Sequence, residues 1–393
     1  MKKILIMLNS LDIGGSQTYV ITLTKELINR GYTVWVCAKD GELADEIIKL
    51  GGHIYIPPRF FRETKIEKKR FIKAISYNLI FIIPIIFKIH IFCWKEKFSF
   101  IISQQPLPTF TACLLSKMFR IPMIYIVHGT LPNEFPPLLY KQFRYKLPRI
   151  VVISKEIKNF LIQKYGLNEK NIQLIINCID IEKFNTYKYH FNSNILKKTI
   201  VYISNIHLGK IDAIQNLILA APLVYKKNNN ISFCLVGKGN AFDKINKLAT
   251  EVNKKIGEVI INCVGGYKDV RPFIQKADIF IGIGRSAREA MAMGIPTILV
   301  GHLKGENGGN YGGIIDKNNI EAMEFYNLSG RHSSVETTPQ LLAKDILYIL
   351  QNKDFALKIS AFELKYINDY CSSKIICDKF EIEMKDVIEK GNC

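Results

Sequence analysis

Short apolar, β-branched runs alternate with helical patterns along the whole chain, and this alternation constrains the fold more than any other feature. Ser16–Arg30 has apolar residues at three- and four-residue steps, which predicts a helix that ends at Gly31. Strands that alternate with such helices predict right-handed βαβ units and a parallel sheet. The first series of predicted buried strands is Ile4–Leu8, Thr33–Ala38, His53–Pro57, Phe100–Ser103, Met123–Val127, Ile150–Ile153 and Gln173–Ile176.

A polar stretch without periodicity, Tyr187–Lys198, separates this series from a second one. At roughly 150 residues per domain, 393 residues also favour two domains. We therefore predict an α/β chain with two tandem Rossmann-like doubly wound domains, 1–190 and 198–360, that face a cleft. A charged helical tail, 361–393, is expected to pack back on the first domain. The second series holds strands Thr199–Ser204, Ile231–Val236, Val259–Val264, Asp278–Ile283 and Ile295–Val300, with helices at Ala213–Tyr225 and Phe242–Val252.

The net charge of +19 predicts an anionic partner. Residues 1–190 hold 28 basic and 14 acidic residues, and Arg59–Lys97 alone holds ten basic and three acidic ones. The apolar run Leu79–Phe87 is too short to span a bilayer, so this segment is either a basic helix on an anionic membrane surface or a core helix with a basic outer edge. A nucleic-acid partner is not expected, because the sequence has no recognisable nucleic-acid-binding motif in which basic and aromatic residues alternate.

The nine cysteines show no CxxC pair and no zinc-type spacing with histidine, so no metal site is expected. The apolar run after Met1-Lys2-Lys3 is only five residues long and predicts a buried strand rather than a signal peptide. A reduced, cytoplasmic location follows.

Two motifs follow strands of the first domain, where ligands bind in open α/β sheets. Gly14-Gly15-Ser16 opens the first helix, and its backbone suits a phosphate or a sugar. The alternative is a tight turn with Ser16 as the N-cap. His128-Gly129 ends the strand Met123–Val127, where the imidazole can touch a substrate hydroxyl or simply bind a neighbouring loop.

The second domain carries the richest segment, Gly282–Pro296, in which a strand ends in a glycine turn and a short helix follows. The Arg285 guanidinium can bind a phosphate there through two parallel N–H groups, and Glu289 can accept two hydrogen bonds from a ribose diol. A surface Arg285–Glu289 pair is the alternative. Gly237-Lys238-Gly239 permits close approach to a phosphate or base, or is ordinary turn chemistry.

Taken in order, these motifs resemble the retaining GT-B glycosyltransferases that use nucleotide-sugar donors, the glycosyl transferases group 1 of bacterial surface-polysaccharide type. The resemblance covers nearly the whole chain. It is carried by Gly14-Gly15, by Val127-His128-Gly129, by Ile176-Asn177-Cys178-Ile179-Asp180 followed by Phe184, and by Glu289-Ala290-Met291-Ala292-Met293-Gly294-Ile295-Pro296.

The resemblance implies that the first domain binds a glycan or lipid-diphosphate-linked acceptor and the second a UDP- or GDP-linked sugar, without metal or cofactor. Transfer with retention would serve cell-surface polysaccharide or glycolipid synthesis at the cytoplasmic face of the inner membrane. His128 would touch the transferred sugar, and Lys210, with Arg285, would neutralise the leaving diphosphate. The implied donor-binding residues are Gly14, Gly15, Asn205, Gly237, Gly239, Gly284 and Glu289.

Three departures from the family pattern keep alternatives open. Asn205 stands where the family often has an arginine, Ile281 stands where it has the first of two glutamates, and Cys178 replaces a glycine. A non-catalytic partner subunit on the same fold is one alternative. The other is a nucleotide-sugar epimerase or hydrolase, which would need a catalytic carboxylate near the sugar.

Overall fold

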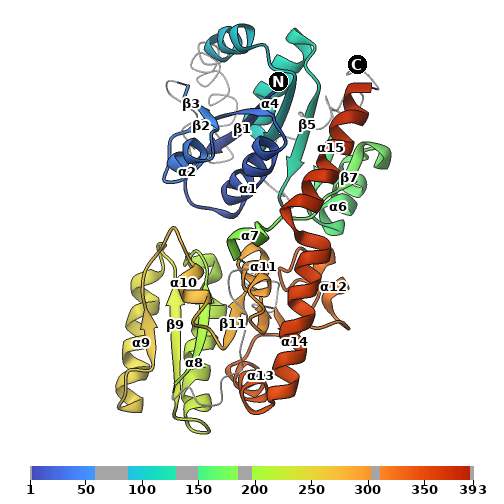
Figure 1. Ribbon diagram of the computed structural model, residues 1–393. Coiled ribbons are helices and arrows are strands. Elements are labelled where there is room, and N and C mark those ends of the chain that lie inside the picture. The colour runs from blue at the N-terminus through green and yellow to red at the C-terminus, as the bar shows by residue number, and fades with distance from the viewer. Residues whose placement is uncertain (1, 58–86, 130–148, 185–196, 302–309, 390–393) are drawn as a thin grey trace. The chain divides into compact units, whose positions relative to one another are not determined.

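The computed structural model describes residues 2–57, 87–129, 149–184, 197–301 and 310–389 (Figure 1). It divides into two units, Met1–Cys178 together with Ser373–Cys393, and Ile179–Ser372. Most of the stretch 187–198, where we placed the boundary, lies outside the described residues. The tail is shared, because the helix α14 (Lys353–Tyr366) belongs to the second unit and α15 (Ser373–Glu389) to the first.

The first unit is built on a parallel seven-stranded sheet in the order β3-β2-β1-β4-β5-β6-β7. All seven expected strands are present. Ile4–Leu8 is completely buried, as a strand with helices on both faces must be. The strands are β1 Lys3–Ser10, β2 Thr33–Lys39, β3 His53–Tyr55, β4 Phe100–Gln104, β5 Met123–Val127, β6 Arg149–Val152 and β7 Ile172–Leu174.

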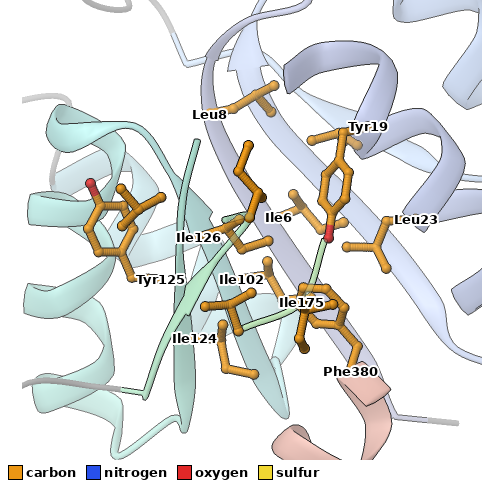
Figure 2. Packing of buried hydrophobic residues seen from close by; sticks show 14 of the residues in the cluster. Ile6, Leu8, Tyr19, Leu23, Ile102, Ile124, Tyr125, Ile126, Ile175 and Phe380 are labelled. Carbon is orange, nitrogen blue, oxygen red and sulfur yellow. The ribbon is translucent and has the colours of Figure 1, made fainter. Parts of the chain in front are cut away.

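Helices cover the sheet of the first unit, and one core forms between β1, β4, β5, α1 and α15. Figure 2 shows Tyr19 and Leu23 of α1 facing the strand residues Ile6 and Ile102, with Phe380 of α15 beside them. Residues 87–96 are also helical. The other helices of this unit are α1 Gly15–Asn29, α2 Ala44–Lys49, α4 Pro106–Phe119 and α6 Lys155–Tyr165.

Ion pairs join α15 to the first unit in addition to its apolar face. Arg30, after α1, donates to Glu381 at 2.6 Å and to Asp378 at 2.7 Å. Arg149, at the start of β6, pairs with Glu383 at 3.2 Å and also binds Asp386. The chain's last helix is therefore a structural part of the unit in which the chain begins.

The second unit has a six-stranded sheet in the order β10-β9-β8-β11-β12-β13, with β8–β12 at the five expected positions. The strand β13 (Tyr311–Ile314) was not expected and pairs antiparallel with β12. Its Gly312 allows close packing, since a Cβ there would lie 2.8 Å from the Leu299 side chain. The parallel strands are β8 Lys198–Ile203, β9 Ile231–Val236, β10 Ile261–Cys263, β11 Ile279–Gly282 and β12 Thr297–Val300.

The helices of the second unit complete a doubly wound α/β arrangement, so each unit has the Rossmann-like architecture that we expected. These helices are α7 Ile181–Phe184, α8 Ile211–Tyr225, α9 Phe242–Ile256, α10 Arg271–Ile274, α11 Gly284–Ala292, α12 Ile320–Phe325, α13 Pro339–Gln351 and α14.

Within the described ranges, no helix is both long enough and apolar enough to cross a bilayer. The apolar run Leu79–Phe87, which we considered as a membrane span, lies outside the described ranges except for Phe87.

A buried carboxyl group joins α14 to the sheet of the second unit. Glu363 is completely buried, and its Oε1 accepts a hydrogen bond of 3.0 Å from the Thr297 N–H at the start of β12. Burial raises the pKa of Glu363 well above its ordinary value of 4.5, although the hydrogen bonds from Thr297 oppose this shift.

The Glu363→Gln variant should therefore lose less stability than the wild type as pH rises from 5 to 8. A pKa raised by folding gives stability that is fully present below 4.5 and is lost as pH rises through the folded-state value. The variant keeps an amide oxygen for Thr297 and carries no charge. Urea unfolding at both pH values measures the difference. Glu251→Gln, at an exposed position of α9, should keep the wild-type dependence. Equal dependence in the wild type and Glu363→Gln would contradict this account.

Candidate functional site

In each sheet the chain reverses its winding direction between two neighbouring strands, and open α/β sheets bind ligands at this switch point. In the second unit it lies between β8 and β11, and in the first between β1 and β4. Most of the candidate residues follow these strands or their immediate neighbours β5 and β9.

Two glycines after β9 pack against the loop that follows β8. A Cβ on Gly237 would overlap the Ser204 carbonyl oxygen, and one on Gly239 would overlap the carbonyl oxygen of Ile206. The Ile206 N–H donates to the Lys238 carbonyl at 3.0 Å, so the loops are also hydrogen-bonded. Close packing between two loops therefore accounts for both glycines, whether or not a ligand also approaches them.

The start of α11 lies at the same switch point and is held by hydrogen bonds from a backbone N–H and from one hydroxyl group. Gly284, with a φ of 58°, adopts the left-handed conformation that favours glycine, and its N–H donates to the Leu328 carbonyl at 2.8 Å. The Ser286 hydroxyl lies 3.0 Å from the Ile283 carbonyl and 3.2 Å from that of Ile203, at the end of β8. No side chain caps this helix, so its first N–H groups present a positive dipole end.

Arg285 and Glu289 form an ion pair one helical turn apart. Arg285 Nε donates to Glu289 Oε1 at 2.9 Å, and each side chain is only 10% exposed. The i,i+4 pair that we considered as an alternative is present, but it is largely buried rather than a surface pair. Such a pair is costly to desolvate, which favours a role beyond helix stability.

Burial and nearby positive charges act in opposite directions on the pKa of the Glu289 carboxyl group. Burial raises the pKa of its carboxyl group, and the Asp269 carboxylate acts in the same direction. Arg285 and then Lys183, from α7, oppose the shift. A carboxylate held in this way is a strong acceptor for hydroxyl groups.

Arg288 is a residue of this site that the sequence did not single out. Its side chain is completely buried, pairs with Glu324 of α12 at 2.6 Å and donates to the Asn327 side chain at 3.0 Å. Asn327 and Leu328 both have a positive φ, of 55° and 50°. Because the Leu328 carbonyl binds Gly284, Arg288 supports the strained turn that fixes the start of α11. Only the buried contact reveals this role, since an arginine in an amphipathic helix normally predicts an exposed face.

Asn205 and Lys210 belong to the loop after β8. Asn205 is exposed, and its carbonyl accepts hydrogen bonds from the Ser204 hydroxyl and the His207 N–H, both at 3.2 Å. The backbone of Lys210 ends a short 3₁₀ turn before α8. The Lys210 side chain lies outside the described part of the chain.

In the first unit, Gly14 and Gly15 stand at the start of α1. Gly14 takes the N-cap position and no side chain caps the helix, so Ser16 is not the cap. The Ser16 hydroxyl instead binds the Gln17 side chain at 2.9 Å. A Cβ on Gly15 would meet no atom within 4 Å. The first turn therefore offers an uncapped, positively polarised backbone.

His128 follows β5 and is partly buried. Its Nε2 lies 2.8 Å from Oε1 of Gln104, at the end of β4. Its ring contacts Tyr19 edge-on, with centroids 5.3 Å apart. The first unit thus brings His128 to the carboxyl edge of its sheet, and the second unit gathers Asn205, Gly237, Gly239, Gly284, Arg285 and Glu289 at the corresponding edge of its own.

Comparisons with known proteins agree with this geometry. The model of a family described as Glycosyltransferase Family 4 matches residues 13–183, and that of Glycosyl transferases group 1 matches residues 197–324. No curated protein matches the chain.

Several solved structures are similar over almost the whole chain. A glycosyltransferase from Rickettsia africae has 16% identity and a TM-score of 0.71, with 98% of each chain covered. HepE from Anabaena, solved with UDP and glucose, has 17% identity and a TM-score of 0.70, with 98% of this chain and all of that one covered. A putative UDP-N-acetylglucosamine 2-epimerase from Listeria monocytogenes has 12% identity and a TM-score of 0.65, with 99% and 98% covered. At these identities the likenesses show the fold.

Gly239→Ala should lower the free energy of unfolding by about 1–3 kcal/mol, because its Cβ would meet backbone atoms that cannot move independently. Urea unfolding measures the effect. Gly209→Ala is the matched control, since a Cβ there meets nothing within 4 Å, and its effect should stay within about 0.5 kcal/mol. Equal stability of the two variants would show that the loops after β8 and β9 are not closely packed.

Proposed function

The chain belongs to the GT-B glycosyltransferases, and on that premise we propose that it transfers a hexosyl group from a nucleotide sugar to a glycan or lipid-linked glycan. We propose further that the anomeric configuration is retained and that the product serves cell-surface polysaccharide or glycolipid synthesis. A UDP-linked donor is the first choice, because HepE was solved with UDP and with UDP-glucose.

The buried Arg285–Glu289 pair at the start of α11 is the observation that carries this proposal. Two neighbouring hydroxyls of a ribose can both donate to one carboxylate, and Glu289 is the buried carboxylate at this switch point. A diphosphate beside it would meet the uncapped helix end and the Arg285 guanidinium.

Charge stabilisation is the chemistry that this arrangement supplies. When the bond between the sugar and the diphosphate breaks, negative charge grows on the leaving phosphate oxygens. Arg285 and the first N–H groups of α11 are positioned donors that would stabilise this charge in the transition state, and we propose that Lys210 adds a further positive charge. Arg285 is oriented for the task by its bond to Glu289.

In the first unit, we assign the acceptor and the transferred sugar to the residues at the carboxyl edge of the sheet. His128 would contact a sugar hydroxyl, and the backbone at Gly14 and Gly15 would approach the sugar or a phosphate. None of these groups carries a formal negative charge, so they suit a hydroxyl-rich or phosphorylated ligand.

Nucleotide binding tests the proposal directly. The melting temperature of the whole chain is measured with UDP, GDP, ADP, CMP and their common sugars. A ligand at 100 times its dissociation constant should add about 2.7 kcal/mol of stability. Glu289→Gln should weaken the binding of the stabilising nucleotide about ten- to a hundredfold, because a hydrogen bond to a charged group is lost.

Glu251→Gln, on the exposed face of α9, is the control and should respond like the wild type. An unchanged response in Glu289→Gln would place the nucleotide elsewhere. No stabilisation of the wild type by any nucleotide would favour a non-catalytic partner subunit instead.

A membrane surface is the second partner that we propose, at the cytoplasmic face. Phe87, Ile91 and Trp94 recur at helical spacing in residues 87–96 and are 62%, 38% and 67% exposed. Lys88 and Lys95 are exposed on the same helix. Exposed aromatic residues beside lysines are typical of helices that lie on anionic bilayers. Arg149, a basic residue that would extend such a surface on sequence grounds, is instead bound by Glu383 and Asp386.

Residues 59–86 of the basic segment Arg59–Lys97 lie outside the described ranges, and so do three further basic residues, Lys141, Arg144 and Lys146. The test therefore uses the described helix, residues 87–96. Trp94→Ser combined with Phe87→Ser should weaken binding to vesicles with anionic lipid at least about tenfold, because two large apolar side chains no longer insert. Ile48→Ser, at another exposed apolar position of the first unit, is the control. Co-sedimentation at low salt measures the effect, and equal binding by the wild type and the double variant would contradict the proposal.

A further inference from the structure

The strands β1 and β4 stand on the two sides of the switch point in the sheet of the first unit. Met7 and Ser103 are the last residues that pair between them. Beyond this pair the chain continues from β1 into α1 and from β4 into α4. The two helices cover opposite faces of the sheet, because α1 packs in the core that holds Ile6 and α4 in the core that holds Met7. The strand ends therefore separate at the point where an open α/β sheet binds its ligand.

The side chain of Gln105 continues the link between the two strands beyond their last pair. Gln105 directly follows β4, and its Oε1 accepts a hydrogen bond of 2.7 Å from the Asn9 N–H, near the end of β1. Because a backbone N–H can only donate, the oxygen of this amide and not its nitrogen must face Asn9. A carboxylate could therefore replace the amide in this bond, whereas an apolar side chain of the same length could not.

Gln105 makes this bond from a strained backbone conformation. Its φ of 63° and ψ of 152° fall in a region that essentially only glycine adopts. Pro106 follows and favours the extended ψ, but it does not account for the positive φ. The buried Thr109 hydroxyl lies 2.7 Å from the Gln105 carbonyl and 3.1 Å from the Ser103 hydroxyl, and so ties residue 105 to β4. Strain of this kind persists only where surrounding contacts impose it, and it is concentrated at functional sites.

The loop that begins at Asn9 is also held from its other side. The Leu43 N–H donates to the Leu11 carbonyl at 2.9 Å. A Cβ on Gly41 would overlap the backbone of Leu11, so the segment after β2 packs directly against this loop. The loop, residues 9–15, leads into the start of α1. It is therefore fixed between contacts from the side of β2 and from the side of β4, and Gln105 supplies the contact on the β4 side.

We propose that Gln105 is a positioning residue, which uses a strained backbone to hold the loop 9–15 in the conformation that receives a ligand at the switch point of the first sheet. The ligand is the one that the proposed function assigns to this edge of the sheet, through a sugar hydroxyl or a phosphate oxygen. The choice of ligand rests on the proposed function, whereas the positioning of the loop does not.

Hydrogen–deuterium exchange of the whole chain without any ligand tests the positioning. Gln105→Met should speed exchange in residues 8–16 about five- to tenfold, because the Asn9 N–H loses its acceptor. Gln105→Glu keeps an acceptor and should stay within about threefold of the wild type. Gln163→Met, at an exposed position of α6, is the control and should leave this segment unchanged. Unchanged exchange in Gln105→Met, or equally fast exchange in both Gln105 variants, would overturn the proposal.

Melting temperatures measure the strain. Gln105→Ala and Gln105→Gly both lack the side chain, but only glycine adopts the backbone conformation of residue 105 without strain. Gln105→Gly should therefore melt about 2 °C or more above Gln105→Ala. At Gln163, inside α6, the order of the same two substitutions should be reversed, since glycine destabilises a helix. A Gln105→Gly variant that melts at or below Gln105→Ala would overturn the proposal, because the conformation would then store no strain.

The dissociation constants of UDP and UDP-glucose, or of the corresponding pair for the nucleotide that stabilises the wild type, identify the ligand group. If a sugar hydroxyl contacts the loop, Gln105→Met should weaken the nucleotide sugar at least about threefold more than the nucleotide. If a phosphate contacts it, both should weaken alike. Unchanged binding of both, despite faster exchange of the loop, would overturn the role of Gln105 in ligand binding.

The outcome is independent of the test of the proposed function. If no nucleotide stabilises the wild type, the proposed function fails, and the exchange and melting results still decide whether Gln105 positions the loop. A nucleotide response that depends on Glu289, together with unchanged exchange in Gln105→Met, would leave the transferase assignment standing and remove the role of Gln105.

Discussion

The hydrogen bond from the Gly284 N–H to the Leu328 carbonyl fixes where α11 begins, and the second unit's site depends on it. Gly284 can make this bond because it adopts a left-handed conformation, and Leu328 can accept it because Arg288 supports the turn before it. Once the helix starts there, Arg285 and Glu289 must lie one turn apart at the switch point. The buried contact between Arg288 of α11 and Glu324 of α12 therefore acts on the site without touching a ligand.

Much of the fold follows from the sequence, because parallel strands buried on both faces are continuous apolar runs. The strand β13 could not be predicted, since Tyr311-Gly312-Gly313-Ile314 has no apolar run and forms by packing on Leu299. The sequence located Arg285 and Glu289 correctly within one helix. It offered the Arg285–Glu289 pair only as a surface pair. It could not show that this pair is buried, or that Arg288 is buried against Glu324, because the surroundings of these side chains include α7 and α12, which lie far away in the chain.

The two glycines after β9 show how a sequence motif can have a structural cause. Their spacing suggested a phosphate loop, and their positions are explained by carbonyl groups of the neighbouring loop. In the first unit a residue outside any motif contacts a candidate site residue, since the buried Gln104 lies with its side-chain oxygen 2.8 Å from Nε2 of His128. A buried polar contact, rather than a glycine pattern, reveals this neighbour of the candidate site.

The central claim is that a nucleoside diphosphate binds at the start of α11 in the second unit. Hydrogen–deuterium exchange of the whole chain, with and without saturating UDP or whichever nucleotide binds best, tests it most directly. The account predicts slower exchange in residues 283–289 and in the loop 204–210, because a bound nucleotide would hold the start of α11 and the loop after β8 closed and so reduce their local opening. Protection confined to other segments, with these two unchanged while the nucleotide is bound, would contradict it.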